Sequence, residues 1–392
     1  MELVIILFLF FCLPCSLFLS LVSLISFLNR AWLKPIMIQS SMSRQGVNGP
    51  PYRFLHGNTK EINHMRNEAL GTSMELLSHH QLLPRIMPHV YSWTKIHGMN
   101  FLNWYGTRPQ LVITDPELVK EVLSNKEGAY LCFVFQAMIP AMIHSVEVML
   151  QRWRDVKEVD AFQEFKLLTS EVISRTAFGS SYVEGKNVFD MLTKLGLIVN
   201  RNNFKVSSIP GLDKLWRTSD DIESDKLEQA IKEAIIELIR KREGRGGHFN
   251  GNFLQMAMVV NESLRLYPPV FNLTREVERE TKLGNYLLPA NMALSLPILA
   301  IHHNPLLWGE DCHLFKPERF AADHGLAKAF LPFGSGPRTC VGLNFAAAEI
   351  KIALSMILRR YRFSLSPSYV HAPFNMLTIR PKHGLQILLH PL

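Results

Sequence analysis

The chain has 392 residues, of which 47% are hydrophobic and 19% are charged, so it is long enough for one large or two ordinary folded domains. No single basic block accounts for its net charge of +8, so nucleic acid is not the expected partner, and an anionic lipid surface or an acidic protein fits as well. The five cysteines form no zinc-type cluster. Their odd, scattered arrangement disfavours a disulfide framework and favours a reducing compartment.

The first thirty residues are predicted to form a membrane anchor. Residues 3–29 contain no charged side chain, and as a helix they would reach about 40 Å, enough to cross a bilayer. Arg30 and Lys34 follow the apolar run, whereas a secretory signal peptide would begin with basic residues and be shorter. The pattern therefore favours an uncleaved single-pass anchor over residues 1–30, with the rest of the chain in the cytosol.

Residues 31–57 are predicted to form a linker with a hinge at Pro50-Pro51, and residues 58–392 a single domain. The domain is expected to be mainly α with a minor β region, and no internal repeat is visible. In the first part of the domain we expect helices near 58–80 and 85–97, and then strands at 100–106 and 110–115 joined by a Thr-Arg-Pro turn. A helix from Pro116 and mainly helical structure over 137–242 are expected to follow, up to a glycine-rich break at 244–252. The rest is predicted to contain a helix to Tyr267, short strands over 270–298, a helix to about Arg360, and terminal strands.

Cys340 is the residue with the clearest chemical context, in the stretch LPFGSGPRTCVG at residues 331–342. Glycines let backbone N–H groups crowd around the sulfur, and a helix that begins just past Cys340 directs its positive dipole end at it. Both effects favour a thiolate, which acts as a metal ligand or a nucleophile. No His–Asn or His–Asp arrangement for a cysteine hydrolase is evident. The alternative for an isolated cysteine is a buried, inert side chain.

The stretch FGSGPRTCVG fits the form F-x-x-G-x-R-x-C-x-G in full and resembles the haem-binding loop of the cytochrome P-450 superfamily. The resemblance implies a haem b whose iron is held by Cys340, with the sulfur shielded by Phe333. It also implies that Arg338 and, by its position in FNLTREVE, Arg275 bind the haem propionates. The remaining cofactor-binding residues implied by the motif are glycines of the loop: Gly334, Gly336 and Gly342.

Two further motifs agree with this resemblance in content and order. Glu262 and Arg265 match E-x-x-R, a spacing that places both side chains on one helix face. FKPERF resembles the family's P-E-R-F element, which implies that Arg319 joins them in a buried structural triad behind the haem loop. The match is continuous over residues 253–392. It assigns a mainly apolar substrate-contact segment, which suits a lipophilic substrate: Val270, Phe271, Asn272 and Leu273.

The segments LLTSEVISRTAFGSSYVEGK and GPPYRFLHGN are similar to a plant microsomal branch that oxidises gibberellins, brassinosteroids, cytokinins and triterpenoids. The resemblance implies a monooxygenase in the endoplasmic reticulum membrane that hydroxylates a small lipophilic substrate with O₂. Electrons would come from NADPH only through NADPH–cytochrome P-450 reductase. Basic residues on the last helix provide a candidate docking face: Lys351, Arg359 and Arg360.

The chain departs from the family pattern at two places. The A-G-x-[DE]-T motif of the central oxygen-activating helix is absent between residues 200 and 262, and the W-x-x-x-R element of an upstream propionate-binding helix is absent near 129–139. We therefore expect an incomplete fold with deletions near 129–139 and 244–256, no assignable catalytic acid–Thr pair, and impaired turnover. A gene-model error, a splice variant or a pseudogene would each produce such a chain.

Two other functions are compatible with these residues. A non-oxygenase haem-thiolate isomerase or dehydratase acts on a hydroperoxide and needs neither O₂ nor a reductase, which agrees with the loss of the acid–Thr motif. However, the cysteine loop of this chain keeps the standard monooxygenase form. A non-catalytic haem-binding or degenerate membrane protein is the other alternative.

Overall fold

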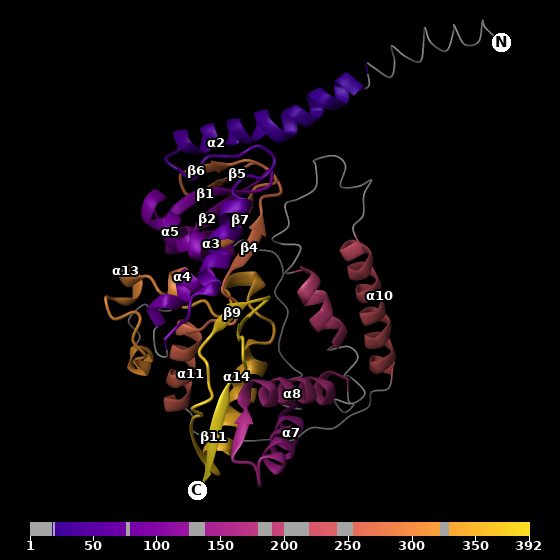
Figure 1. The fold of residues 1–392 in the computed structure, drawn as a ribbon, viewed down its shortest axis with the longest axis vertical. Helices are drawn as coiled ribbons and strands as arrows, with labels where there is room; N and C mark the ends of the chain where they lie inside the picture. Colours follow the sequence, from indigo (N-terminus) through magenta and orange to yellow (C-terminus); the bar gives the residue numbers. More distant parts are fainter. Residues whose placement is uncertain are drawn as a thin grey trace, which may run out of the picture.

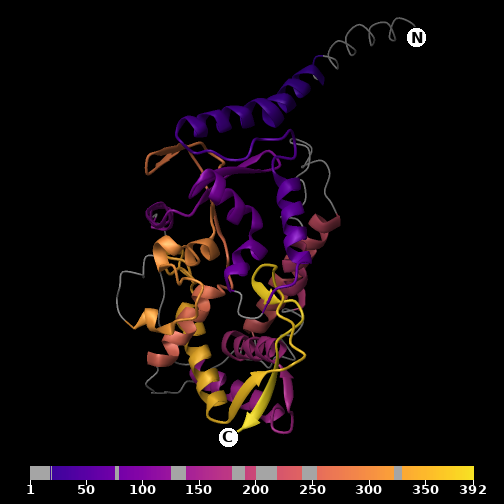
Figure 2. The ribbon, with the colours of Figure 1, turned by 60° about the vertical axis from the view of Figure 1, so that its left-hand side comes forward.

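The computed structural model describes Phe18 and residues 20–75, 79–124, 138–178, 190–199, 219–240, 254–321 and 329–392. Helices dominate this part of the chain, and its strands form a four-stranded sheet, a three-stranded sheet and two two-stranded ribbons (Figures 1 and 2). The expectation of a mainly α fold with a minor β region is confirmed. The four-stranded sheet lies in the upper part of Figure 1, close to the N-terminal helix, and the three-stranded sheet lies near the C-terminus.

The N-terminal helix runs without a break from Ser20 to Arg44 and includes a π-helical turn, η1 (Asn29–Leu33), followed by α2 (Lys34–Arg44). Ala31, Pro35 and Met42 are buried, and their spacing of four and seven residues places them on one helix face. This face packs on the domain, so the helix that begins in the predicted anchor ends as part of the folded body.

The segment after α2, predicted as a hinge, folds back along the first strand. The backbone N–H of Leu102 donates to Asn48 O at 2.9 Å, and a Cβ at Gly49 would lie 1.8 Å from Leu102 O, so only glycine fits. The side chain of Asn58 donates to Pro51 O at 3.1 Å. These contacts hold the Pro50-Pro51 segment against the domain rather than leaving it free between anchor and domain.

The larger sheet has the order β1-β2-β7-β4, with β2 and β7 parallel and the other pairs antiparallel. Gly106, at φ +59°, opens the tight turn between β1 and β2, so Arg108 and Pro109 belong to β2 instead of the predicted turn. Pro109 lies outside the residues of β2 that pair with β7, so its missing N–H removes no bond there. The strands are β1 (Asn100–Tyr105), β2 (Arg108–Ile113), β4 (Leu273–Glu276) and β7 (Ala293–Leu296).

Short helices and a ribbon flank this sheet. Asp115 caps α6 by accepting from the backbone N–H groups of Glu117 and Leu118, as expected for an Asp-Pro helix start. The second expected helix is divided into α4 and α5 because Pro88 begins a new one. The elements are α3 (Thr59–Gly71), η2 (His79–Gln81), α4 (Leu82–Ile86), α5 (Pro88–His97), α6 (Pro116–Leu123), β5 (Thr281–Leu283) and β6 (Tyr286–Leu288).

A second core lies between the helices near the C-terminus and the three-stranded sheet, whose order is β3-β11-β8. Trp153 is buried in this core, and its indole N–H donates to Glu164 at 3.1 Å. The elements are α7 (Ile139–Arg152), β3 (Glu158–Asp160), α8 (Ala161–Ile173), η4 (Ser174–Phe178), α14 (Leu343–Leu358), β8 (Tyr361–Leu365), β9 (Pro373–Asn375), β10 (Ile379–Pro381) and β11 (Gln386–Pro391).

The remaining helices lie along the chain between residue 190 and the Cys340 loop. Residues 241–253, which lie outside the described residues, are all that separates α10 from α11, and they include the glycine-rich segment. Most of the other predicted deletion point, near 129–139, also lies outside the described residues. These helices are a segment at 190–199, α10 (Ser219–Arg240), α11 (Leu254–Leu266), α12 (Ile298–His302), α13 (Pro305–Trp308), η5 (Pro317–Phe320) and η7 (Gly336–Arg338).

One acidic side chain is buried on α14. Glu349 is buried, and its Oε1 atom has no hydrogen-bond partner within the described part of the chain. Burial raises the pKa of Glu349 from 4.5 to about 7, because a carboxylate loses hydration in the interior. The neutral acid is therefore the form that suits this site.

We predict that Glu349→Gln stabilises the chain above pH 7. The folded chain keeps this group protonated up to about pH 7 while the unfolded chain ionises it from about pH 4.5, so stability is lost as the pH rises through this window. The ratio of the folding equilibrium constants of variant and parent should rise by at most about tenfold for each pH unit across the window. Urea denaturation at pH 4, 6 and 8 measures the gap, and a gap that does not depend on pH would contradict the prediction.

Candidate functional site

The Cys340 loop connects the core to the start of α14. The backbone N–H of Cys340 donates to Phe333 O at 2.8 Å, and the Thr339 hydroxyl donates to Gly336 O at 2.6 Å, so the loop closes on itself. The N–H of Leu343, the first residue of α14, donates to Cys340 O at 3.2 Å. The thiol of Cys340 is exposed and lies just before the N-terminal end of α14.

Two glycines of the loop occupy left-handed backbone conformations, which side chains other than glycine rarely adopt. Gly334 and Gly336 both have φ +71°. A Cβ at Gly336 would also lie 2.1 Å from the carbonyl oxygen of Leu123, so the loop can approach the end of α6 only with glycine there. A Cβ at Gly342 would lie 3.9 Å from the Cys340 sulfur, in ordinary contact. The first two glycines therefore determine the path of the loop.

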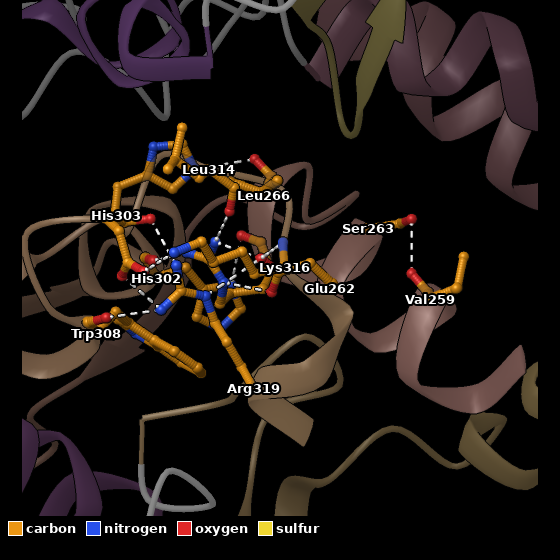
Figure 3. A network of polar contacts seen from close by, with 12 residues as sticks. Val259, Glu262, Ser263, Leu266, His302, His303, Trp308, Leu314, Lys316 and Arg319 are labelled. Atoms are coloured by element: carbon orange, nitrogen blue, oxygen red, sulfur yellow. Dashed lines mark hydrogen bonds and ion pairs between the residues drawn. The ribbon is translucent and has the colours of Figure 1, made fainter. Parts of the chain in front are cut away.

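Glu262 and Arg265 form a fully buried ion pair on α11, with both side chains 0% exposed (Figure 3). Arg265 Nε and Nη2 donate to the two carboxylate oxygens of Glu262 at 2.8 and 2.9 Å, in a bidentate arrangement. Arg265 Nη1 also donates to His302 O at 2.8 Å. A buried pair of this kind is tolerated only when its remaining polar atoms have partners.

Arg319 completes the cluster from the loop after α13. Its Nε lies 3.4 Å from Glu262 Oε1, an ion pair without hydrogen-bond geometry. Its guanidinium donates to Trp308 O at 3.0 Å and pairs with Asp311 at 2.7 Å. The backbone N–H of Lys316 donates to Glu262 Oε1 at 2.9 Å. The structure therefore brings the three residues of the predicted triad together and shows that Asp311 neutralises the second arginine.

His302 connects this cluster to the beginning of the Cys340 loop. Its Nε2 accepts from the backbone N–H of Leu331 at 2.9 Å, which requires the proton to be on Nδ1, and Nδ1 lies 3.2 Å from Arg265 O. Burial and the charges of His303 and Arg265 lower the pKa of His302 from 6.5 to about 3, so the ring is neutral at neutral pH. The imidazole thus joins α11, α12 and the loop through two hydrogen bonds.

Arg275 and Arg338 line one cleft of about 540 Å³, together with Glu276, Glu278 and Asn291. Burial, and then the charge of Arg338, lower the pKa of Arg275. Within the described residues, neither guanidinium forms an ion pair with a carboxylate. Two guanidinium groups that line one cleft, one of them two residues before the exposed Cys340, fit a haem. Its two propionates would offset the repulsion between the guanidinium groups, and its iron would take the sulfur.

The predicted substrate segment follows α11 and lies beside the loop. Leu273 Cδ1 lies 3.7 Å from the position of a Cβ on Gly334. Val270 is exposed, whereas Phe271 and Leu273 pack against separate hydrophobic cores. The side chain of Asn272 accepts from the Ser295 hydroxyl at 2.8 Å and is thereby tied to the sheet. Of the four residues, Val270 has the side chain with the most solvent exposure.

His302 and Asp311 were not predicted from the sequence, although both lie within residues 253–392, which resemble the family. Two adjacent histidines are as typical of an exposed surface or a metal site as of a buried side chain that connects two segments by hydrogen bonds. No group of three or more potential metal-ligating side chains is present among the described residues. The burial of His302 could be recognised only once α12 was placed between α11 and the loop.

We predict that Glu262→Ala destabilises the fold by about 3–5 kcal/mol, because it leaves the Arg265 guanidinium buried without its counter-ion. The midpoint of urea denaturation, followed in detergent-solubilised full-length chain, measures the loss. Arg152→Met is the matched control, because Arg152 is 37% exposed and its pair with Glu164 should contribute about 0–1 kcal/mol. Equal losses in the two variants would show that the buried pair is not structurally important.

We also predict that stability falls as the pH falls from 6.5 toward 3, in part because of His302. The unfolded chain protonates this ring below its pKa of 6.5, whereas the folded chain keeps it neutral down to about pH 3. His302→Gln can still accept from Leu331 but does not titrate, so the stability difference between parent and variant should shrink at pH 4.5 relative to pH 8. A difference that is constant across this range would contradict the assignment.

Comparison with known proteins agrees with this geometry. The cytochrome P-450 family model matches residues 253–388, which include α11, the triad and the Cys340 loop. A cytochrome P-450 of Panax ginseng, CYP749A22, is 40% identical, and the alignment covers 94% of each chain. The 11-oxo-beta-amyrin 30-oxidase of Glycyrrhiza uralensis is 31% identical, with 93% of this chain and 94% of that protein covered. Secologanin synthase 1 of Catharanthus roseus is 29% identical, with 92% and 94% covered.

The fold is also similar to a solved structure. A retinoic acid-bound cyanobacterial CYP120A1 superposes with a TM-score of 0.62 and 16% sequence identity, over 88% of this chain and 99% of that chain. The structural likeness identifies the fold, and the identity over most of the Panax ginseng protein identifies the family. With its E-x-x-R pair, P-E-R-F element and cysteine loop in order, the chain belongs to the cytochrome P-450 monooxygenase family.

Proposed function

We propose that this chain binds haem b through the Cys340 thiolate and descends from a membrane-bound monooxygenase of a small lipophilic substrate. The observation that carries the proposal is an exposed thiol at the start of α14, beside two guanidinium groups that share a cleft. Cys340 would hold the iron, while Arg275 and Arg338 would bind the propionates. A thiolate-ligated haem supplies the activation of O₂. Phe333 would shield the sulfur from water.

The substrate class is proposed from the substrate segment and the relatives. Val270 offers an exposed apolar side chain three residues before Leu273, which lies beside the loop, and this suits a lipophilic molecule. One relative is a beta-amyrin oxidase by name and two are named secologanin synthases. A terpenoid, steroid-like molecule or hormone is therefore the substrate class to test first.

Electrons are proposed to reach the haem from NADPH through NADPH–cytochrome P-450 reductase. Arg359 and Arg360 are exposed at the end of α14, and Lys351 is half-buried on the same helix. A basic face suits an acidic flavoprotein partner. We further propose that residues 58–392 act as one domain on the cytosolic side of the endoplasmic reticulum membrane. The helix Ser20–Arg44 is long and apolar enough by composition to enter a bilayer.

Turnover by this chain is proposed to be impaired. The alignment with the Panax ginseng protein runs over 495 positions, whereas the chain has 392 residues, so long stretches of that protein have no counterpart here. Apolar side chains on the helices at either end of residues 241–253 are exposed, as expected if a central helix that would cover them is missing: Ile222 and Val259.

The ligation proposal is tested by the spectrum of the purified full-length chain, reduced and exposed to CO. We expect a thiolate-type Soret band that is lost in Cys340→Ala, because no other sulfur is available at the loop. Cys312→Ala is the matched control, since Cys312 is buried and its thiol donates to His303 O at 3.4 Å. A thiolate band that persists in Cys340→Ala, or no haem uptake by the parent chain, would overturn the assignment.

Impaired turnover is tested by adding reductase, NADPH and a panel of triterpenoids to the haem-loaded chain. We expect little product, whereas the Panax ginseng relative assayed in parallel reports whether the system is competent. A chimaera that receives that relative's sequence between residues 240 and 254 should gain activity. Turnover of the parent chain at the relative's rate would refute impairment. Product formed equally without NADPH would support the isomerase or dehydratase alternative.

A further inference from the structure

Three histidines outside the proposed haem site are brought together from separate segments of the chain. His80 lies on η2, His303 follows α12, and His313 lies between α13 and η5. The ring centroids of His303 and His313 are 5.5 Å apart, and the two ring planes are inclined by 73°. The ring centroids of His80 and His313 are 6.2 Å apart. His313 therefore lies next to both of the other imidazoles.

The ring of His303 is held so that one nitrogen keeps a free lone pair. His303 is buried, and its Nε2 atom lies 2.9 Å from the carbonyl oxygen of Leu266 (Figure 3). A carbonyl oxygen only accepts, so Nε2 carries the proton and Nδ1 of the neutral ring carries a lone pair. That Nδ1 atom has no hydrogen-bond partner within the described part of the chain. Metal-ligating histidines usually have this form, because the bond from the other nitrogen to a carbonyl fixes the ring and its tautomer.

His313 offers a second nitrogen of the same kind. The residue is half-buried, and its Nδ1 atom is buried without a hydrogen-bond partner among the described residues. Burial, followed by the charges of His80, Arg265 and His79, lowers the pKa of His313 below its usual 6.5. Burial lowers the pKa of His303 from 6.5 to about 3. Both rings are therefore neutral at neutral pH, which is the form that binds a metal ion.

The spacing of the three rings suits a single metal ion. Zn–N bonds are about 2.0–2.1 Å long, so two imidazoles on one zinc have ring centroids roughly 5–6.5 Å apart. Both observed distances lie in this range. The described residues contain no preformed group of three ligands, so His303 and His313 supply two positions and His80 has to turn to supply the third. His80 is exposed, so its ring can turn without disturbing the core.

We propose that His303 and His313 form a binding site for a divalent transition-metal ion of the zinc type, which His80 completes from η2. A water would take the fourth position, as in other zinc sites with three protein ligands. Imidazole nitrogens suit zinc, copper and nickel, whereas magnesium and calcium prefer oxygen ligands. The nearby charge of Arg265 is matched by Glu262, so it does not exclude a cation. The bound ion would fasten η2 to the end of α12. The inference rests on neither haem binding nor turnover.

Zinc binding is measured on the full-length chain, purified in detergent without a polyhistidine tag, freed of contaminating metals with a chelator and dialysed against zinc. We expect one tightly bound zinc per chain in addition to any that Cys340 binds, which is determined by measuring Cys340→Ala in parallel. The X-ray absorption spectrum at the zinc edge of Cys340→Ala should show nitrogen ligands at about 2.0–2.1 Å and no sulfur at about 2.3 Å.

His80→Gln and His313→Gln should each weaken zinc binding by about 100-fold or more, because even the loss of an outer-shell partner costs about 10–100-fold. His80 is exposed, so His80→Gln is expected to fold normally and keeps the test decisive if His313→Gln folds poorly. The matched control is His144→Gln, which replaces an exposed histidine of α7 and should bind zinc as the parent chain does.

A second readout is the thermal unfolding midpoint with and without zinc. Only the native chain gathers the three imidazoles, so zinc should raise the midpoint of the parent chain and of His144→Gln. It should have little effect on His80→Gln and His313→Gln. Amide hydrogen exchange over η2 should slow on zinc addition in the parent chain alone of the parent, His80→Gln and His313→Gln, because the ion would fasten this segment to the end of α12.

Three results would overturn the metal site. A parent chain that retains no zinc beyond the amount lost in Cys340→Ala would leave the two unpartnered nitrogens to a shared water. Equal zinc retention by the parent chain, His80→Gln and His313→Gln would place the ion elsewhere. Sulfur among the ligands of the zinc that Cys340→Ala retains would assign the ion to another cysteine. None of these results bears on haem binding, which is read from the reduced CO spectrum.

Discussion

The Glu262 carboxylate is buried away from water, so its negative charge has to be balanced by neighbouring groups. The arrangement around the Cys340 loop depends on the groups that balance it. Its oxygens receive hydrogen bonds from the Arg265 guanidinium on the same helix and from the backbone N–H of Lys316, while Arg319 approaches from η5. An unmatched buried carboxylate would cost several kcal/mol, so α11 and η5 must stay in contact. Arg265 also donates to the backbone carbonyl of His302, and the Nε2 atom of His302 accepts from the backbone N–H of Leu331 in the loop. The same network therefore connects α11 to the loop.

The described contacts hold the Cys340 side of the site in place, whereas the A-G-x-[DE]-T motif expected on the oxygen-activating side is absent from the sequence. Binding the cofactor and activating oxygen require different groups. The proposed haem site needs a sulfur ligand and two cationic groups, and the residues that we propose for these roles are Cys340, Arg275 and Arg338. Directing protons to oxygen requires an acid–Thr pair on a helix, and no segment of the chain contains that motif.

The fold was predictable where local signals were strong. Pro116 marked the start of α6, and two short strand-like runs on either side of a turn marked β1 and β2, because helix starts and turns are local properties. The Thr-Arg-Pro turn was misplaced by two residues, since Gly106 alone has the backbone conformation that the turn requires. The Pro50-Pro51 segment was interpreted as a hinge because proline stiffness is visible in sequence. The hydrogen bond that joins Asn48 of the same segment to Leu102 involves a residue that is distant along the chain, so it is not visible in the sequence.

The sequence by itself determined the family, the choice of Cys340 as the proposed iron ligand, and the pairing of Glu262 with Arg265. Each of these depends on residue types at short, fixed spacing. Tertiary structure decided that Asp311 neutralises Arg319, that His302 is a neutral link to the loop, and that the ring of His303 lies against that of His313. These partners lie between 8 and 29 residues apart along the chain. A buried charge and a buried ring each require a partner, but only folding determines which distant residue provides it.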